Sequence, residues 1–141
     1  MSARQDALLR ALIVAFGAGT DDLAELFTDD AEVWSPNMYA TSLAEVTEAF
    51  GDREEAFSNQ AVTVRSIDEI GNKVVAEWRL DADHTGRLTF DDQNWIDATG
   101  AHVYMGGVSI AEYSGDKIRA VRTYFDDLAF KVDAAKHDGG A

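Results

Sequence analysis

The residues best suited to chemistry lie in the stretch RLDADH, which runs from Arg79 to His84. The stretch places a guanidinium, two carboxylates and an imidazole within six residues, at the predicted end of a β-strand. Because an imidazole titrates near neutral pH, His84 is suited to general acid or base catalysis, or to hydrogen bonding a substrate oxygen. Arg79 and Asp81 could activate water, although a solvated ion pair worth about 1 kcal/mol or less is the simpler interpretation.

Alternation along this strand decides which of these groups can share a cavity. Successive side chains of a regular strand point to opposite faces of the sheet. Trp78, Leu80 and His84 then share an apolar face, which belongs to the core or to a cavity. Arg79 and Asp81 fall on a charged face that points to solvent or to a partner subunit. A β-bulge would reverse this assignment locally. Two interpretations of His84 stay open: a pocket residue, or a side chain that orders the following turn.

Other kinds of site have no signature in the sequence. The chain has no cysteine, which excludes disulfides, thiolate metal sites and cysteine nucleophiles. Its three histidines lack metal-ligand spacing and no glycine-rich phosphate loop precedes a helix, so we expect no metal and no cofactor. The 26 acidic residues against 12 basic ones give a formal net charge of −14, which disfavours partners such as nucleic acid and anionic membranes. The apolar run at residues 7–16 is interrupted by Arg10 and has helical spacing, so we interpret it as an amphipathic helix and expect a cytoplasmic protein. No apolar run reaches the about 18 residues of a membrane span.

The elements that must position these residues follow from periodicity and turn signals. Amphipathic helices are predicted to begin at capping boxes formed by Ser2 with Gln5 and by Ser42 with Glu45, and a further helix at Thr20. A short strand at residues 31–36 ends at the only proline. The longer predicted strands lie at residues 61–70, 73–84, 102–114 and 117–126, with tight turns at 70–73 and 114–117. A final short helix is predicted from about residue 127.

Helices followed by a series of hairpins predict an α+β fold. We expect one domain over residues 1–132 and a flexible tail over residues 133–141. A strongly bent antiparallel or mixed sheet that wraps around the N-terminal helices forms a cone-shaped α+β barrel. The interior of such a cone can hold a small molecule.

Several motifs resemble the SnoaL-like polyketide cyclases. They are HTG at residues 84–86, TG at 99–100 and SGDKIRAVRTYFDDLAF at 114–130. The superfamily includes nuclear transport factor two, ketosteroid isomerases and limonene-epoxide hydrolase, and its usual opening is similar to residues 16–36. The resemblance covers nearly the whole chain and implies the cone fold and a homodimer paired through the outer face of the sheet. It is specific about fold but not activity, because this fold hosts enzymes and plain binding modules.

Each catalytic pattern of the superfamily is incomplete in this chain. In SnoaL-type cyclases a histidine on the penultimate strand and an aspartate on the last strand do the acid–base work, and these places fall on Ser109 and Thr123. The acidic base of the ketosteroid isomerases falls on Ser35. The Arg-x-Asp pair of limonene-epoxide hydrolase matches Arg79 and Asp81, but its aspartate on the last strand falls again on Thr123.

Three hypotheses follow. The first is a cofactor-independent cyclase or isomerase for a hydrophobic, ring-shaped molecule. In it, His84 exchanges the proton, and the substrate oxygen is polarised or oriented by Ser109, Thr123, Asn37 or Tyr39. The second is a non-catalytic binding protein on the same scaffold. The third is an epoxide-hydrolase-like activation of water by Arg79 and Asp81. The expected catalytic residues are His84, Asp81 and Arg79, and the expected substrate-binding residues are Trp34, Ser35, Asn37, Tyr39, Met105, Ser109, Thr123 and Phe125.

Overall fold

The computed structural model describes residues 1–17, 19–51 and 56–125, without the side chains of residues 90 and 91. In chain order the elements are α1 (Ala3–Ala15), α2 (Leu23–Leu26), β1 (Phe27–Ser35), β2 (Met38–Ala40), α3 (Leu43–Gly51), β3 (Phe57–Ile70), β4 (Lys73–His84), β5 (Leu88–Asp91), β6 (Asn94–Ile96), β7 (His102–Ser114) and β8 (Lys117–Phe125). The predicted final helix and the predicted tail fall outside the described residues.

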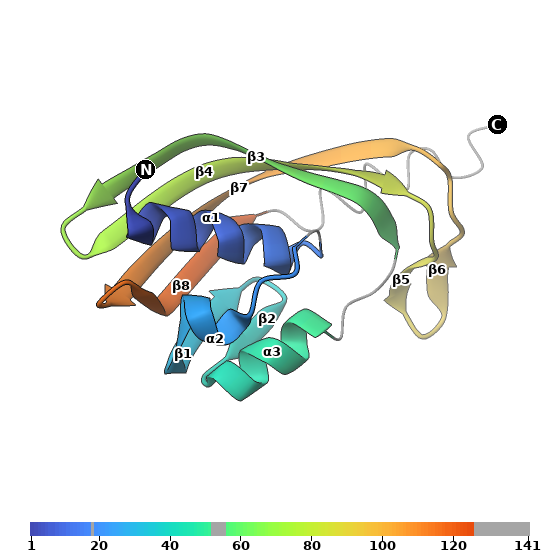
Figure 1. Ribbon diagram of the computed structural model, residues 1–141. Helices are drawn as coiled ribbons and strands as arrows, with labels where there is room; N and C mark the ends of the chain where they lie inside the picture. The colour runs from blue at the N-terminus through green and yellow to red at the C-terminus, as the bar shows by residue number, and fades with distance from the viewer. Residues whose placement is uncertain (18, 52–55, 126–141) are drawn as a thin grey trace.

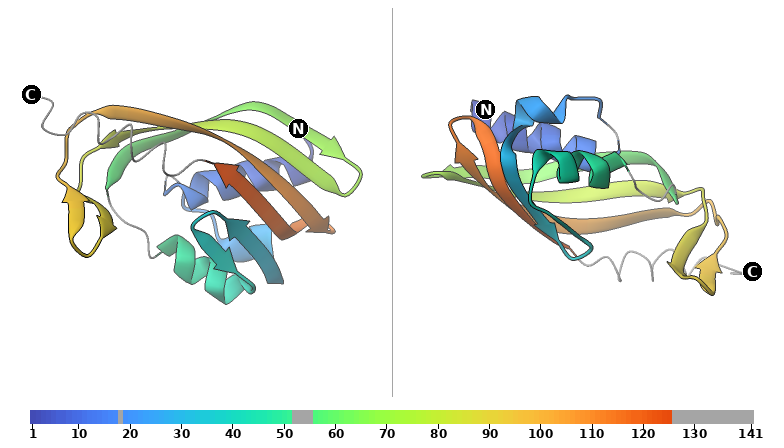
Figure 2. Two further views of the ribbon diagram at one scale, coloured as in Figure 1. Left: turned by 180° about the vertical axis from the view of Figure 1, so that it is seen from behind. Right: turned by 90° about the horizontal axis from the view of Figure 1, so that it is seen from below.

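The main sheet has six strands in the order β2-β1-β8-β7-β4-β3. Neighbouring strands are antiparallel except β1 and β8, which are parallel. The long strands β3, β4 and β7 arch over α1, and α3 lies below α1 on the same side of the sheet (Figure 1). The views from behind and from below show that the arch is curved but not closed, and that the separate β5–β6 hairpin stands at one end (Figure 2). The expected α+β cone is confirmed.

Local sequence signals account for the helix starts. Ser2 and Gln5 form the predicted capping box, in which each side chain accepts a hydrogen bond from the other residue's backbone N–H. At α3, Ser42 Oγ accepts from the backbone N–H of Glu45, and the Glu45 carboxylate accepts from the N–H of Thr41. The prediction of Thr20 as a cap was wrong, because the N-cap of the short α2 is Asp22, whose carboxylate accepts from Ala24 N–H.

The two predicted hairpins are confirmed. Turns with Gly71 at φ 60° and Gly115 at φ 62° connect β3 to β4 and β7 to β8. These positive φ values favour glycine, because a Cβ would clash with the neighbouring backbone. The bounds of β4 and β7 agree with the predicted strands, and β3 begins four residues earlier than predicted, at Phe57.

The core lies between the concave face of the sheet and the helices. Leu8 and Leu12 of α1 are buried against this face, and Trp78 of β4 is 1% exposed beside Phe16, with ring centroids 4.9 Å apart. The position of α1 beneath the curved sheet therefore determines how deep a space can remain between the sheet and the helices. Within the described residues, no helix has the length and apolar character that crossing a bilayer requires.

Candidate functional site

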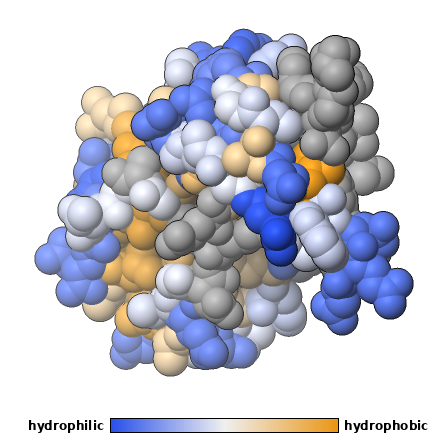
Figure 3. All heavy atoms as spheres, turned by 90° about the vertical axis from the view of Figure 1, so that its right-hand side faces the viewer, coloured by the Kyte–Doolittle hydropathy of each residue, from blue (hydrophilic) through white to orange (hydrophobic). Residues whose placement is uncertain are grey.

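A cavity of about 640 Å³ lies beneath the sheet. Apolar side chains make up most of its wall, and they come from α1 and the residue that follows it, from α3 and from all six strands of the main sheet. They include Leu8, Ala11, Leu12, Phe16, Phe27, Val33, Met38, Phe50, Phe57, Leu80, Met105, Val121 and Phe125. Polar groups on the wall are few: Ser35, Asn37, Glu45, Glu48, Gln60 and Thr123. On the side of the molecule that carries β5 and β6, apolar side chains are visible between hydrophilic ones (Figure 3).

The strand β4 is regular along its pairing with β7. Their register runs without a shift from Lys73 opposite Glu112 to Asp83 opposite His102. The irregularities of this part of the sheet lie in the β3–β4 pairing, where β3 carries the extra residues. The alternation predicted from sequence is therefore confirmed: Leu80 lines the cavity, and the side chains on either side of it point to the opposite face.

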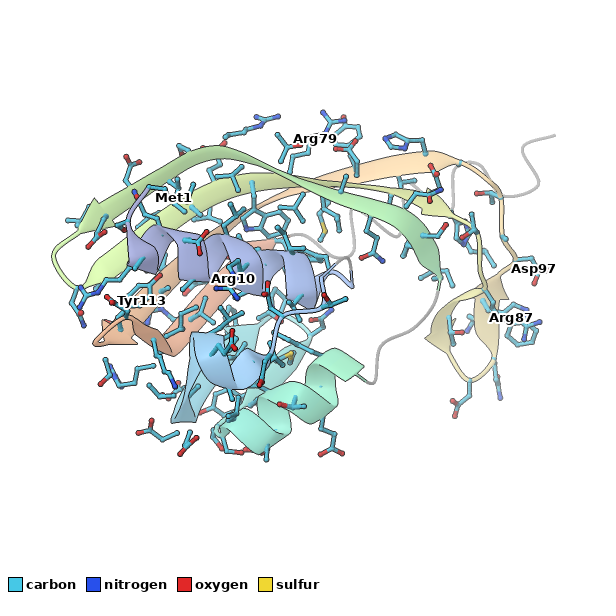
Figure 4. All side chains as sticks on the ribbon, in the orientation of Figure 1. Met1, Arg10, Arg79, Arg87, Asp97 and Tyr113 are labelled. Atoms are coloured by element: carbon cyan, nitrogen blue, oxygen red, sulfur yellow. The ribbon has the colours of Figure 1, made fainter. Side chains whose placement is uncertain are left out.

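Arg79 lies on the outer, convex face of the sheet, opposite α1 (Figure 4). Asp81 is two residues further along the regular strand β4 and therefore shares that face. Two hydrogen bonds of 3.0 Å join the guanidinium to the two carboxylate oxygens, and the guanidinium carbon lies 4.1 Å from the ring centre of Tyr104. His102 bridges two carboxylates. Its Nε2 lies 2.9 Å from Asp81 Oδ1, and its Nδ1 lies 3.1 Å from Asp83 Oδ1. We call Arg79, Asp81, Asp83, His102 and Tyr104 the outer-face cluster.

Charge pairing shifts the titration of this cluster. The hydrogen bonds from Arg79, and then from His102, hold the pKa of Asp81 below its usual value. The hydrogen bonds to Asp81 and Asp83 raise the pKa of His102. Neither Arg79 nor Asp81 lines the cavity. The epoxide-hydrolase-like hypothesis required both side chains inside the cavity, and the regular register of β4 puts them outside it.

His84 is on the inner face and is fully buried, but it is not part of the cavity wall. Its ring packs against Phe57, which does line the cavity, with ring centroids 5.5 Å apart. Nδ1 lies 2.9 Å from Thr99 Oγ1, and the backbone of His84 hydrogen-bonds Gly100 N–H and the carbonyl of Ala101. Nε2 is buried with no hydrogen-bond partner among the described residues. His84 thus orders the segment before β7 and also keeps one ring nitrogen unpaired.

Ser109 and Thr123 are neighbours on β7 and β8, directly opposite each other in the register. Thr123 lines the cavity, whereas Ser109 is fully buried behind it. Their hydroxyl oxygens are 2.8 Å apart, and Ser109 Oγ also accepts a 3.1 Å hydrogen bond from Trp78 Nε1. The expectation that Ser109 itself faces the cavity is corrected by this burial.

The remaining residues expected at a binding site do reach the cavity wall. They are Trp34, Ser35, Asn37, Tyr39, Met105 and Phe125. Ser35 Oγ donates to Asn37 Oδ1 over 2.9 Å, so these two polar groups already satisfy each other in part. Tyr39 is 63% exposed and stands at the edge of the cavity, and the Trp34 ring packs against Tyr124 at 5.2 Å.

Sequence reasoning missed Glu45, Glu48 and Gln60 on the wall. Glu45 and Glu48 are three residues apart on α3 and so share a helix face, which is the only signal that could have grouped them. Hydrogen bonds from Thr41 lower the pKa of Glu45. In the described part of the chain, no group of three or more His, Asp and Glu side chains is arranged to hold a metal ion.

The comparison with protein-family models identifies one family, and the comparison with solved structures supports its fold. The family model for SnoaL-like polyketide cyclases matches residues 7–133. A proposed SnoaL-like polyketide cyclase from Jannaschia sp. CCS1 has 18% identity, with 94% of this chain and 92% of that one covered, at a TM-score of 0.77. A proposed polyketide cyclase from Acidithiobacillus ferrooxidans has 16% identity, with 96% of each chain covered, at a TM-score of 0.80.

An epoxide hydrolase from M. tuberculosis, described as similar to limonene-epoxide hydrolase, has 13% identity. The match covers 96% of this chain and 86% of that one at a TM-score of 0.67. At these identities the likeness shows the fold alone. Among curated proteins, none matches the sequence.

Proposed function

We propose that this chain, which belongs to the SnoaL-like polyketide cyclase family, binds a hydrophobic small molecule in the cavity beneath its sheet. The observation that supports this proposal is a cavity of about 640 Å³ with a mainly apolar wall and few polar groups. Small-molecule sites in proteins share this size and this character, with polar groups that fix the orientation of the ligand. A cytoplasmic location is part of the same proposal.

The test is calorimetric titration with 1-tetralone, a two-ring ketone, together with variants that fill the cavity. Ala49 of α3 lines the cavity, whereas Ala44 on the same helix is exposed and does not. Ala49→Trp should abolish binding, and the matched control Ala44→Trp should bind as the wild type does. Met105→Trp is a second blocking variant on the opposite wall. Equal binding by all four proteins, or none by the wild type, would contradict the proposal.

A second candidate function is cofactor-independent acid–base catalysis by His84, as in a cyclase or isomerase. The observation in its favour is the buried Nε2 without a partner. Buried polar atoms are nearly always hydrogen-bonded, and exceptions occur at catalytic sites. Thr99 Oγ1 accepts from Ala101 N–H and holds Nδ1, so the ring has a fixed orientation. Because Phe57 lines the cavity and packs on the imidazole, a bound ligand reaches Nε2 only if the Phe57 ring turns aside.

This role is tested by hydrogen–deuterium exchange of the carbon-bound protons next to the carbonyl of 1-tetralone, followed by NMR in D₂O. A positioned general base contributes about 10²–10⁴-fold to such a proton transfer. Exchange should be faster with the wild type than in buffer, and His84→Ala should remove the acceleration while 1-tetralone still binds. The control is His102→Ala, which changes a histidine of the outer-face cluster. If His84→Ala exchanges the ketone at the wild-type rate, the catalytic role is refuted.

A homodimer paired through the outer face of the sheet is also part of the proposal. This face exposes Tyr104 (56%) and Tyr124 (47%), with Val108 and Ile110 of β7 half-buried near them. Exposed aromatic residues bordered by charged groups are typical of protein–protein interfaces. Tyr124→Glu should yield a monomer in light scattering after gel filtration, and Ile70→Glu, at the β3–β4 turn, should remain dimeric. A wild type that is monomeric at every concentration would contradict the dimer.

A further inference from the structure

Three polar side chains form a hydrogen-bonded chain that runs from the core to the cavity wall. It begins at Trp78 Nε1 in the core, passes through Ser109 Oγ over 3.1 Å, and reaches Thr123 Oγ1 over a further 2.8 Å. Trp78 and Ser109 are 1% and 0% exposed, whereas Thr123 is half-buried and lines the cavity. Only the last group of this chain can therefore contact a ligand.

The direction of this chain follows from the chemistry of its first member. An indole N–H can donate but not accept, so Ser109 Oγ must be the acceptor of the first hydrogen bond. In the described part of the chain, the only other partner of Ser109 Oγ is Thr123. If Thr123 donated to Ser109, the Ser109 proton would be a buried donor without an acceptor, which is costly. Ser109 therefore donates its proton to Thr123 Oγ1.

This direction leaves the Thr123 proton available. Thr123 Oγ1 accepts from Ser109, and no acceptor for its own O–H is present among the described residues. Hydrogen bonds in a chain polarise one another, so two donors in series make the terminal O–H a stronger donor than an isolated threonine. The cavity wall thus presents an oriented donor within an otherwise apolar surface.

We infer that the Thr123 hydroxyl donates a hydrogen bond to an acceptor oxygen of the cavity ligand, and that the ligand is a neutral carbonyl compound. The inference rests on the proposed function, since it requires a ligand in this cavity. A neutral carbonyl suits the site better than a carboxylate, because Glu45 and Glu48 also line the cavity and the chain carries a formal net charge of −14. Thr123 is a residue that selects and orients the ligand; it does not ionise.

The experiment compares two probes of the same shape. 1-Tetralone carries a carbonyl oxygen, and 1-methylenetetralin has a CH₂ group in its place. A net hydrogen bond corresponds to roughly five- to tenfold in affinity, so the wild type should prefer 1-tetralone by this factor. Thr123→Val keeps the shape of the side chain without the hydroxyl and should remove the preference. Thr123→Ser should retain it. Ser109→Ala should reduce it, because Thr123 is then no longer held as a donor.

A control and a direct readout complete the test. Thr63→Val removes a hydroxyl from the outer side of β3 and should leave the preference unchanged. The infrared C=O stretch of bound 1-tetralone should lie at lower frequency in the wild type than in Thr123→Val. If that variant misfolds, 1-tetralone dissolved in an apolar solvent is the reference for the same shift. Equal affinity for the two probes and an unshifted C=O stretch would overturn this inference while leaving the cavity proposal intact. If the wild type binds neither probe, both fail.

Discussion

Gly107 of β7 lies against the buried face of Trp78, and we predict that this position does not tolerate alanine. A Cβ added at Gly107 would lie 2.8 Å from Trp78 Cε2 and closer still to Cζ2 and Cη2. The indole cannot simply yield, because it is 1% exposed and packs against Phe16 at 4.9 Å and Phe125 at 6.4 Å. Gly106, the preceding residue, is a matched control, since its added Cβ would meet nothing nearer than Trp78 O at 3.8 Å.

The size of the effect follows from three contributions. Overpacking a core costs about 1–3 kcal/mol. Displacing the indole also breaks the bond from Trp78 Nε1 to Ser109, and leaving buried polar groups unpaired costs about 1–3 kcal/mol more. Against these, replacing glycine with alanine restricts the unfolded chain and stabilises the fold by about 0.4–1 kcal/mol. The net expectation for Gly107→Ala is a loss of about 1–5 kcal/mol, whereas Gly106→Ala should be neutral or slightly stabilising.

Urea denaturation followed by circular dichroism measures this difference, at one protein concentration for the wild type and both variants. The slope of the free energy of unfolding against urea should be the same for all three, so that the midpoints report stability alone. If Gly107→Ala falls within about 0.5 kcal/mol of Gly106→Ala, the described packing of Trp78 is refuted, because a difference that small is typical of surface substitutions. Infrared measurement with 1-tetralone then shows whether the displaced indole also disturbs Thr123.

Two further predictions concern groups away from the cavity. Tyr113 donates a 2.7 Å hydrogen bond to the carbonyl of Arg4 in α1, so Tyr113→Phe should cost about 1–2 kcal/mol in urea denaturation and speed amide exchange in α1; unchanged exchange there would contradict this role. Asp81 and Asp83 raise the pKa of His102, so its contribution to stability is complete below its unfolded pKa of about 6.5 and is lost as the pH rises through the higher folded pKa. The melting temperature of His102→Gln relative to the wild type should therefore be lowest at acidic pH and approach it at alkaline pH, and a difference that does not vary with pH would refute the bridge. The pKa values of both aspartates are lowered, Asp81 mainly by Arg79 and Asp83 mainly by Asn59, so their own contributions are present above about pH 3.9 and vanish as the pH falls through the folded values.

Local signals were sufficient to predict the central part of the sheet. Strict alternation over residues 73–84 and the glycines at 71 and 115 define β4 and the hairpin turns without reference to the rest of the chain. The elements that the sequence did not predict depend on pairing between strands that are far apart in the chain. Residues 20–27 have a helical pattern, but Phe27 instead begins β1, because it pairs with Ile118 of β8. The short strand β2 exists only because it lies beside β1.

The same division applies to the site. Strand parity was enough to put Arg79 and Asp81 on the outer face. Parity could not show that His84 stays behind the cavity wall, because the wall at that point is Phe57, which comes from β3. The family resemblance marked Ser109 and Thr123, but the chain from Trp78 that orients their hydroxyls depends on the β4–β7 register. Strand parity and family motifs do not predict burial by a neighbouring strand or hydrogen bonds between strands. These contacts determine which candidate residues reach the cavity.

The parallel pairing of β1 with β8 has a consequence for the order of assembly. On a ribosome, β1, β2 and α3 emerge early, but they join the sheet only through β8, which emerges after every other strand of the sheet. The strands β1 and β2 are therefore not joined to β7, β4 and β3 in one sheet until β8 has been synthesised. Such a long-range contact slows folding, because the entropy of closing the long intervening loop is lost before the contact stabilises the fold. A ligand can therefore stabilise the completed fold, but the cavity that binds it is not yet complete during the earlier steps of folding.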